Sequence, residues 1–200
     1  MQNTIKVCSR QLFSAFVVTT IALLAASTSA QQMCVTDGDY EPPSETDQII
    51  DLPEFHISLS IPENYRLRDR DDGSVEILHP DDYEWLQCLS NGGVGGHGYY
   101  SERIRQIAAD PSMSLREQAS WTAGYNINSD GSHTPFAAEV FPYQANGVEG
   151  YIATSISGYG VTFLGTVPGA DQLLEVTASC DCEVDIEAVA NLLLKIRPLE

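Results

Sequence analysis

The chain has 200 residues, of which 28 are Asp or Glu and 10 are Lys or Arg, giving a formal net charge of −18 at pH 7. This length suits a single domain with a substantial hydrophobic core. A surface this acidic repels nucleic acid and anionic membranes, so neither is an expected partner.

The first 30 residues have the layout of a secretory signal peptide. Lys6 and Arg10 form a short basic start, an apolar run covers 12–26, and small side chains follow up to Ala30. We therefore expect cleavage after residue 30 and a secreted or periplasmic location. Loss of the two basic residues leaves 8 basic and 28 acidic residues, so the mature net charge is 8 − 28 = −20.

Two alternatives to cleavage stay open. The apolar run could be retained as a membrane anchor, but its 15 residues fall short of the roughly 20 that cross a bilayer. A lipid could be attached at Cys34, but the polar or bulky Gln32 and Met33 precede it. Cleavage is the preferred interpretation, and we expect no stable membrane insertion after it.

Four cysteines follow the predicted cleavage site: Cys34, Cys88, Cys180 and Cys182. An even number in an oxidising compartment predicts two disulfides. Cys180 and Cys182 stand two positions apart, so on a strand both side chains point to one face and a bridge between them is awkward. We therefore expect each to pair with Cys34 or Cys88. The alternative interpretation is a redox or soft-metal pair at the Cys-x-Cys sequence.

Residues 31–52 are expected to form an acidic flexible arm, because they carry six acidic residues and no basic one around Pro42-Pro43. One folded domain should then cover 53–200. Its first element is a half-buried strand over 55–61, where apolar side chains alternate with small polar ones and a histidine.

A β-hairpin is predicted from 65–69 and 74–79, connected by a three-residue loop with Gly73 in the left-handed conformation. That loop sets Leu67 opposite Ile77 and Arg68 opposite Glu76, so the apolar pair and the ion pair lie on different faces. A two-residue turn would mix the faces.

Residues 80–98 contain no clear periodicity and are expected to be irregular, before a strand over 99–107. Ser114 and Glu117 form a capping box that opens a helix reaching about residue 124. Asp185 caps a terminal amphipathic helix over 186–197, which Pro198 ends. Further strands are predicted near 125–128, 137–143, 150–157, 160–166 and 172–179. The expected fold class is α+β: a twisted, mainly antiparallel sheet of about seven or eight strands, with the terminal helix and one shorter helix packed on it.

The sequence offers no catalytic, metal or cofactor motif. The glycine-rich segment 92–98 lacks the Lys-Ser/Thr of a phosphate loop. The turn at 69–73 has the wrong spacing for a calcium loop, and the four histidines are dispersed. We therefore expect no catalytic residue, no metal site and no cofactor.

Five of the eight basic residues of the mature chain lie in two alternating stripes on predicted strands. If those strands were adjacent, the stripes would form an anion-binding patch on an acidic protein. The alternative is that each arginine pairs with an acid on the neighbouring strand, such as Glu76. The candidate anion-binding residues are Arg66, Arg68, Arg103 and Arg105, next to Arg70.

The segment Phe55-His56-Ile57-Ser58-Leu59-Ser60-Ile61-Pro62-Glu63-Asn64-Tyr65 resembles the opening of PsbP-like domains, in which F-x-F-x-x-P-x-x-W/Y begins a small exported α/β domain. The order of elements over 53–198 is also similar. The resemblance implies an antiparallel sheet flanked by helices and a non-enzymatic accessory role. It implies no role for any single residue here.

The leading functional hypothesis is an exported, non-catalytic binding or accessory protein with an unidentified protein partner. Two alternatives are a secreted or periplasmic enzyme, hydrolase-like, with a site assembled from dispersed residues, and a secreted interaction factor. A deep cleft of convergent polar groups would favour the enzyme, and an exposed apolar patch would favour the binding module.

Overall fold

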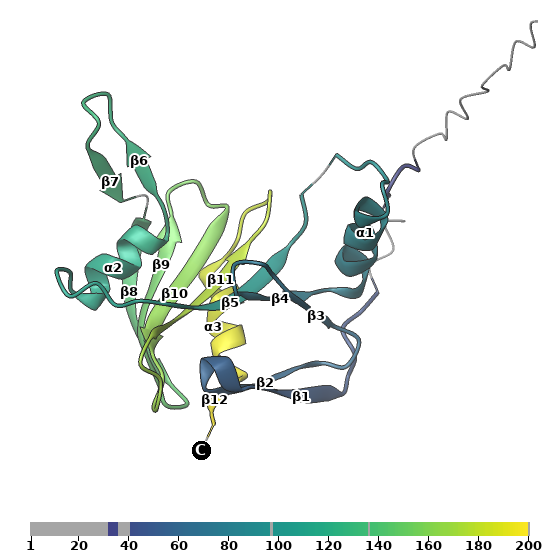
Figure 1. Cartoon of the computed structure of the whole chain (residues 1–200), viewed down its shortest axis with the longest axis horizontal. Coiled ribbons are helices and arrows are strands. Elements are labelled where there is room, and N and C mark those ends of the chain that lie inside the picture. The colour runs from purple at the N-terminus through teal and green to yellow at the C-terminus, as the bar shows by residue number, and fades with distance from the viewer. Residues whose placement is uncertain (1–31, 36–40, 97, 136, 200) are drawn as a thin grey trace, which may run out of the picture. The chain divides into compact units, whose positions relative to one another are not determined.

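The computed structural model describes residues 32–35, 41–96, 98–135 and 137–199 (Figure 1). The predicted signal peptide, residues 1–30, lies outside these ranges. Among the described residues, no helix has both the length and the apolar character needed to cross a membrane.

The largest element is a seven-stranded sheet in which every neighbouring pair is antiparallel, with the order β3-β4-β5-β11-β10-β9-β8. The predicted α+β class and mainly antiparallel sheet are therefore confirmed. Its strands are β3 (Arg66–Asp69), β4 (Val75–Leu78), β5 (Ser101–Ile107), β8 (Ala137–Ala145), β9 (Val148–Ser155), β10 (Gly160–Thr166) and β11 (Leu173–Ser179).

The predicted hairpin register is confirmed. Leu67 pairs with Ile77 and Arg68 with Glu76 across β3 and β4. The Arg70 N–H donates to the Ser74 carbonyl at 2.9 Å, which closes a three-residue loop. Gly73 has a φ of 76°, in the left-handed region that this loop requires.

A smaller sheet joins both ends of the described chain, in the order β1-β2-β12. Its strands are β1 (Asp47–Leu52), β2 (Ile57–Pro62) and β12 (Ile196–Pro198), and a short 3₁₀ turn, Pro53–Phe55, separates β1 from β2. The folded domain therefore begins before residue 53, and the predicted arm over 31–52 is too long. Strand β1 buries every second side chain at least partly, the last being Leu52. Acidic residues at intervening exposed positions obscured this alternation in the sequence.

The terminal helix α3 (Ile186–Leu194) packs on one face of the large sheet and on the small sheet. Asp185 caps it, accepting the Glu187 N–H at 3.1 Å, as predicted. The helix stops at Leu194, so Arg197 lies in β12 rather than in its last turn. The reason is that Ile196 is fully buried as a strand partner of Leu59. The shared core includes Phe55, Ile57, Leu59, Ile104, Phe163, Val176, Val189 and Leu193.

Helix α2 (Leu115–Thr122) lies against the opposite face of the large sheet, beside β8, β9 and β10 (Figure 1). The predicted capping box is present: the Ser114 Oγ accepts the Glu117 N–H at 3.3 Å and the Glu117 carboxylate accepts the Ser114 N–H at 2.9 Å. Ala119 is fully buried against Leu164 and Leu173. A two-stranded sheet follows, β6 (Tyr125–Ile127) and β7 (His133–Pro135).

Helix α1 (Pro80–Ser90) occupies a segment that the sequence predicted to be irregular. The sequence features that favour this helix lie at its N-terminus and do not form a periodic apolar pattern. Pro80 begins it, the His79 ring accepts the Asp81 N–H at 3.4 Å, and Asp81 and Asp82 place negative charge in the first turn. It buries few apolar side chains, so the sequence has no amphipathic pattern that would predict this helix.

The two disulfides join Cys34 to Cys88 and Cys180 to Cys182. The predicted pairing between the distant cysteines was therefore wrong. It assumed that Cys180 and Cys182 share a strand, but β11 ends at Ser179 and the chain bends directly after it. The bend brings the two Cα atoms to 5.2 Å, within the range that a disulfide spans.

Candidate binding site

Residues 41–44 are fixed against the turn that follows β2. The Asn64 side chain donates to the Glu41 carboxylate at 2.8 Å and to the Pro42 carbonyl at 3.0 Å, and it accepts the Ser44 N–H at 2.9 Å. One amide thus satisfies three groups of the segment. This part of the predicted arm is therefore a fixed wall of the domain.

The start of α1 holds the same segment from its other side. The His79 Nε2–H donates to the Glu41 carbonyl, with 2.6 Å between the two atoms. The Glu41 N–H in turn donates to the Asp81 carboxylate at 3.0 Å. The backbone of Glu41 is thus tied to the corner between β4 and α1.

Between this segment and the sheet lies a cavity of about 330 Å³, which we call the Tyr65 cavity. It is lined by Glu41, Pro42, Pro43, Tyr65, His79, Asp82 and Tyr100. Its walls combine three ring side chains, two prolines and two carboxylates. Tyr65 and His79 meet edge to face, with 5.4 Å between their ring centroids.

A second cavity of about 140 Å³, the Glu102 cavity, shares Pro43 and Tyr65 with the first. Its other lining residues are Ile61, Pro62, Glu102, Asn191, Leu192 and Lys195. The two cavities therefore adjoin at Tyr65. Together they form one site, and its lining residues include members of the arm, β2, β5 and α3.

Burial controls the protonation of this site. Desolvation raises the pKa of Glu102, although a hydrogen bond from the Tyr100 hydroxyl at 2.9 Å and the attraction of Lys195 oppose it. Desolvation, then the nearby Glu102 charge, raises the pKa of both Tyr100 and Tyr65. Each of these pKa shifts favours the protonated form, because burial disfavours the charged form of an acid.

The predicted arginine stripes do not form a continuous cationic patch. Strand β4 lies between β3 and β5, so the two stripes are not on adjacent strands. Glu76 stands in register between Arg68 and Arg103 and pairs with Arg68. Its buried carboxylate also accepts from Arg70 at 3.3 Å and from the Tyr99 hydroxyl at 2.9 Å.

The other arginines of the two stripes also contact acidic side chains or backbone carbonyls. Arg105 donates through Nε and Nη2 to the two carboxylate oxygens of buried Glu175, at 2.7 and 2.9 Å. Arg103 lies 3.9 Å from the Asp72 carboxylate. Arg66 donates to the three backbone carbonyls of residues 63–65. Among the candidate anion-binding residues, Arg68, Arg103 and Arg105 thus lie in ion pairs, and Arg66 binds backbone carbonyls.

The sequence did not identify the two cavities. Their walls come from residues 41–43, Tyr65, the start of α1, β5 and α3, which are far apart in the chain. The one local signal was Pro42-Pro43, which was assigned to a flexible arm. Among the described residues, no three His, Cys, Asp or Glu side chains gather as metal ligands.

No family model matches the chain, and no curated protein matches it.

Proposed function

We propose that the mature chain is an exported binding protein that takes a small organic cation, a primary amine or a quaternary ammonium group. The observation that supports this is the lining of the Tyr65 cavity. Three residues with aromatic rings and two with carboxylates line a space of about 330 Å³, and no Lys or Arg is among the described residues around it. Cavities of this size hold small ligands.

The chemistry of that lining suits a cation. Ammonium groups are attracted to aromatic ring faces, and recognition of quaternary ammonium by clustered aromatic side chains is a known use of this attraction. Glu41 and Asp82 add negative charge. The net charge of the mature chain, 8 − 28 = −20, would raise the local concentration of any cation near the surface.

The neighbouring Glu102 supports the same proposal. Its pKa is raised because burial disfavours its charge. A bound cation nearby would favour the ionised carboxylate, so binding would release a proton from part of the population. Affinity should therefore increase as the pH rises past the raised pKa of Glu102.

We prefer binding to catalysis as the role of this site. The perturbed tyrosines are shifted toward the neutral phenol, whereas a tyrosine that acts as a base needs a lowered pKa. The residues lining the two cavities include no Ser, Thr or Cys that could act as a nucleophile beside a base. A hydrolase-like activity is thus the less favoured alternative.

The compartment is part of the proposal. The basic and apolar start of the chain favours export, and the two disulfides are compatible with an oxidising location. An accessory role like that of PsbP-like domains is also a proposal, supported by the opening motif and by the antiparallel sheet with its terminal helix.

Isothermal titration of the purified protein with choline, and with its neutral isostere 3,3-dimethylbutan-1-ol, tests this function. We expect choline to bind about 5- to 30-fold more tightly, since a cation–π contact in a desolvated site contributes about 1–2 kcal/mol. Equal affinity for the two, or no heat with either at millimolar concentration, would refute the proposal.

A matched pair of variants locates the site. Tyr65→Leu removes a ring from the cavity and should weaken choline binding about 10-fold. Tyr125→Leu removes an exposed tyrosine of the β6–β7 ribbon and should leave the affinity unchanged. Equal losses in both variants would place the ligand elsewhere.

A further inference from the structure

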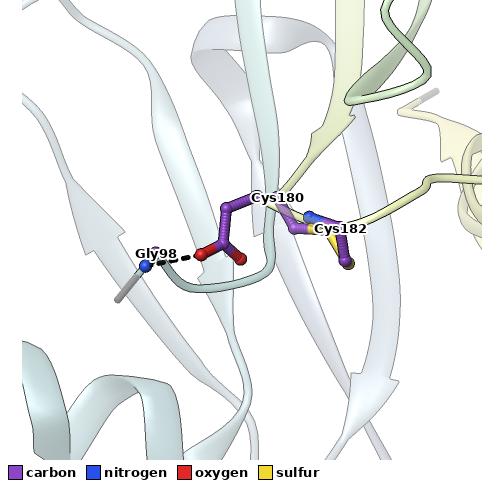
Figure 2. Close-up of a disulfide and its surroundings, with 4 residues drawn as sticks. Gly98, Cys180 and Cys182 are labelled. Carbon is purple, nitrogen blue, oxygen red and sulfur yellow. Dashed lines mark hydrogen bonds between the residues drawn. A yellow bond between two sulfur atoms is a disulfide. The ribbon is translucent and has the colours of Figure 1, made fainter. Parts of the chain in front are cut away.

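The disulfide between Cys180 and Cys182 differs from the other disulfide in its surroundings. It lies just after β11 (Figure 2), and Asp181 stands between its cysteines in the sequence. Cys182 is exposed, whereas Cys180 is half-buried against the core. In the other bridge, Cys34 is 4% exposed. Cys182 is therefore the more accessible cysteine of the pair for an attacking thiol.

The bridge also closes a very short loop. Its cysteines are 2 positions apart, against 54 for Cys34 and Cys88. A disulfide stabilises mainly by restricting the unfolded chain, and this restriction grows with loop length. The short bridge therefore contributes little to stability, and its breakage would leave the fold intact.

The surroundings of Cys180 favour its departure as the leaving sulfur. The backbone N–H of Cys182 donates to the Cys180 Sγ at 2.9 Å. A thiolate formed on Cys180 would keep this donor, which stabilises the negative charge. Leaving-group stability is one of the factors that set the rate of thiol–disulfide exchange.

The intervening Asp181 is held in place by the segment before β5. Its carboxylate accepts the Gly98 N–H at 2.9 Å, and the dashed line at Gly98 in Figure 2 marks this hydrogen bond. A Cβ at Gly98 would come within 2.8 Å of the Asp181 Cγ, so a larger residue would displace the carboxylate. The Cys180 N–H donates to the Tyr159 carbonyl at 3.3 Å, and the Val184 N–H to the Gly158 carbonyl at 2.8 Å. The two cysteines thus sit on a supported turn.

We propose that Cys180 and Cys182 form a thiol–disulfide exchange site that oxidises a reduced polypeptide carrying two cysteines. A partner thiolate attacks the Cys182 sulfur, the S–S bond breaks, and its electron pair goes to the Cys180 sulfur, which takes a proton from water. The second partner thiolate then attacks the partner sulfur of the mixed disulfide and releases Cys182. The partner loses two electrons and two protons, and the cysteine pair gains them.

The rim of the site indicates the chemistry of the partner. Asp181, Glu183 and Asp185 are exposed around the bridge. Ile156 and Tyr159 are 63% and 57% exposed on the β9–β10 turn, whose carbonyls hold the cysteine segment. An extended chain with basic and apolar residues beside its cysteines fits this rim. A second disulfide, such as oxidised glutathione, would restore the bridge for another cycle.

The order in which the two disulfides are reduced tests the proposal on the unmodified protein. The oxidised protein is incubated with a synthetic peptide containing two cysteines flanked by Lys and Leu. Samples are quenched with a thiol-alkylating reagent and mapped by mass spectrometry. We expect alkylation of Cys180 and Cys182 at least 10-fold faster than that of Cys34 and Cys88. Equal rates at both bridges, or no alkylation at either, would overturn the proposal.

Two further measurements assign the roles and the partner. In the presence of the oxidised peptide, Cys180→Ala should trap a mixed disulfide on Cys182 at least 10-fold faster than Cys182→Ala traps one on Cys180. A peptide with Glu in place of Lys should react at least 3-fold more slowly. Equal trapping would refute the assignment of Cys182 as the attacked sulfur, and equal peptide rates would refute the basic partner. Far-UV circular dichroism confirms that both variants are folded.

Discussion

Replacement of Arg105 by methionine should strongly destabilise the fold. The Glu175 side chain is 2% exposed, and Arg105 satisfies both of its carboxylate oxygens at 2.7 and 2.9 Å. The Thr177 hydroxyl also donates to this carboxylate, but at 3.5 Å, the limit of a hydrogen bond. Arg105→Met keeps most of the apolar stem but leaves a charged carboxylate buried without its partner.

The size of the effect follows from this geometry. Removal of one partner of a buried ion pair costs about 3–5 kcal/mol. The side chain of Arg105 is 34% exposed, so water reaches part of the pair and we expect the lower end, about 3 kcal/mol. Arg105→Met combined with Glu175→Gln should cost about 1 kcal/mol, because a buried neutral amide is less costly than a buried charge.

Urea denaturation followed by tryptophan fluorescence measures these free energies of unfolding, with equal m-values as the condition for comparison. Arg66→Met is the matched control. Arg66 is exposed and donates to backbone carbonyls, so its loss should change stability by about 0.5 kcal/mol or less. The reasoning is refuted if Arg105→Met costs under about 1 kcal/mol, or if the double variant is as unstable as the single one.

Three further predictions concern protonation, capping and cross-linking. Because the pKa of Glu102 is raised in the folded protein, its contribution to stability is full below the ordinary carboxyl pKa and is lost as pH rises through the raised pKa. Glu102→Gln should therefore flatten this part of a profile of melting temperature against pH. An unchanged profile would contradict the raised pKa. Hydrogen bonds from Ser114 lower the pKa of Glu117, so the wild type should lose stability as the pH falls through this lowered pKa, a pH dependence opposite to that of Glu102. Glu117→Gln should remove this loss. Ser114→Ala should lower the free energy of unfolding by about 1 kcal/mol in urea denaturation. Replacement of Cys34 and Cys88 by serine should cost up to about 4 kcal/mol for a loop of this length; a gain in stability would contradict this.

Much of the fold could be predicted from local patterns. Alternation of apolar side chains identified β2, and turn residues such as Pro168-Gly169 delimited β10 and β11. Turn chemistry at Gly73 determined the register of β3 and β4. Capping residues identified the starts of α2 and α3. These features depend on neighbouring residues, which a sequence displays directly.

The errors have a common physical origin in contacts between distant segments. Helix α1 depends on its N-terminal caps and on a covalent link to Cys34 rather than on an apolar face. The arginine stripes were considered on adjacent strands, whereas β4 separates them. The Tyr65 cavity needs residues 41–43 beside Tyr100, and a pattern within either segment does not reveal that contact.

The small sheet has a consequence for the order of folding. Its third strand, β12, ends at Pro198, and the Leu199 N–H donates to the His56 carbonyl at 2.9 Å. Strand β2 has β12 as one of its two neighbours, and Ile196 fills the core between the small sheet and α3. The native core therefore cannot close until residues 196–199 are in place beside β2. Strand β2, near the start of the domain, thus depends for one of its two neighbours on a strand more than 130 residues later, so closure of the small sheet requires a long-range contact.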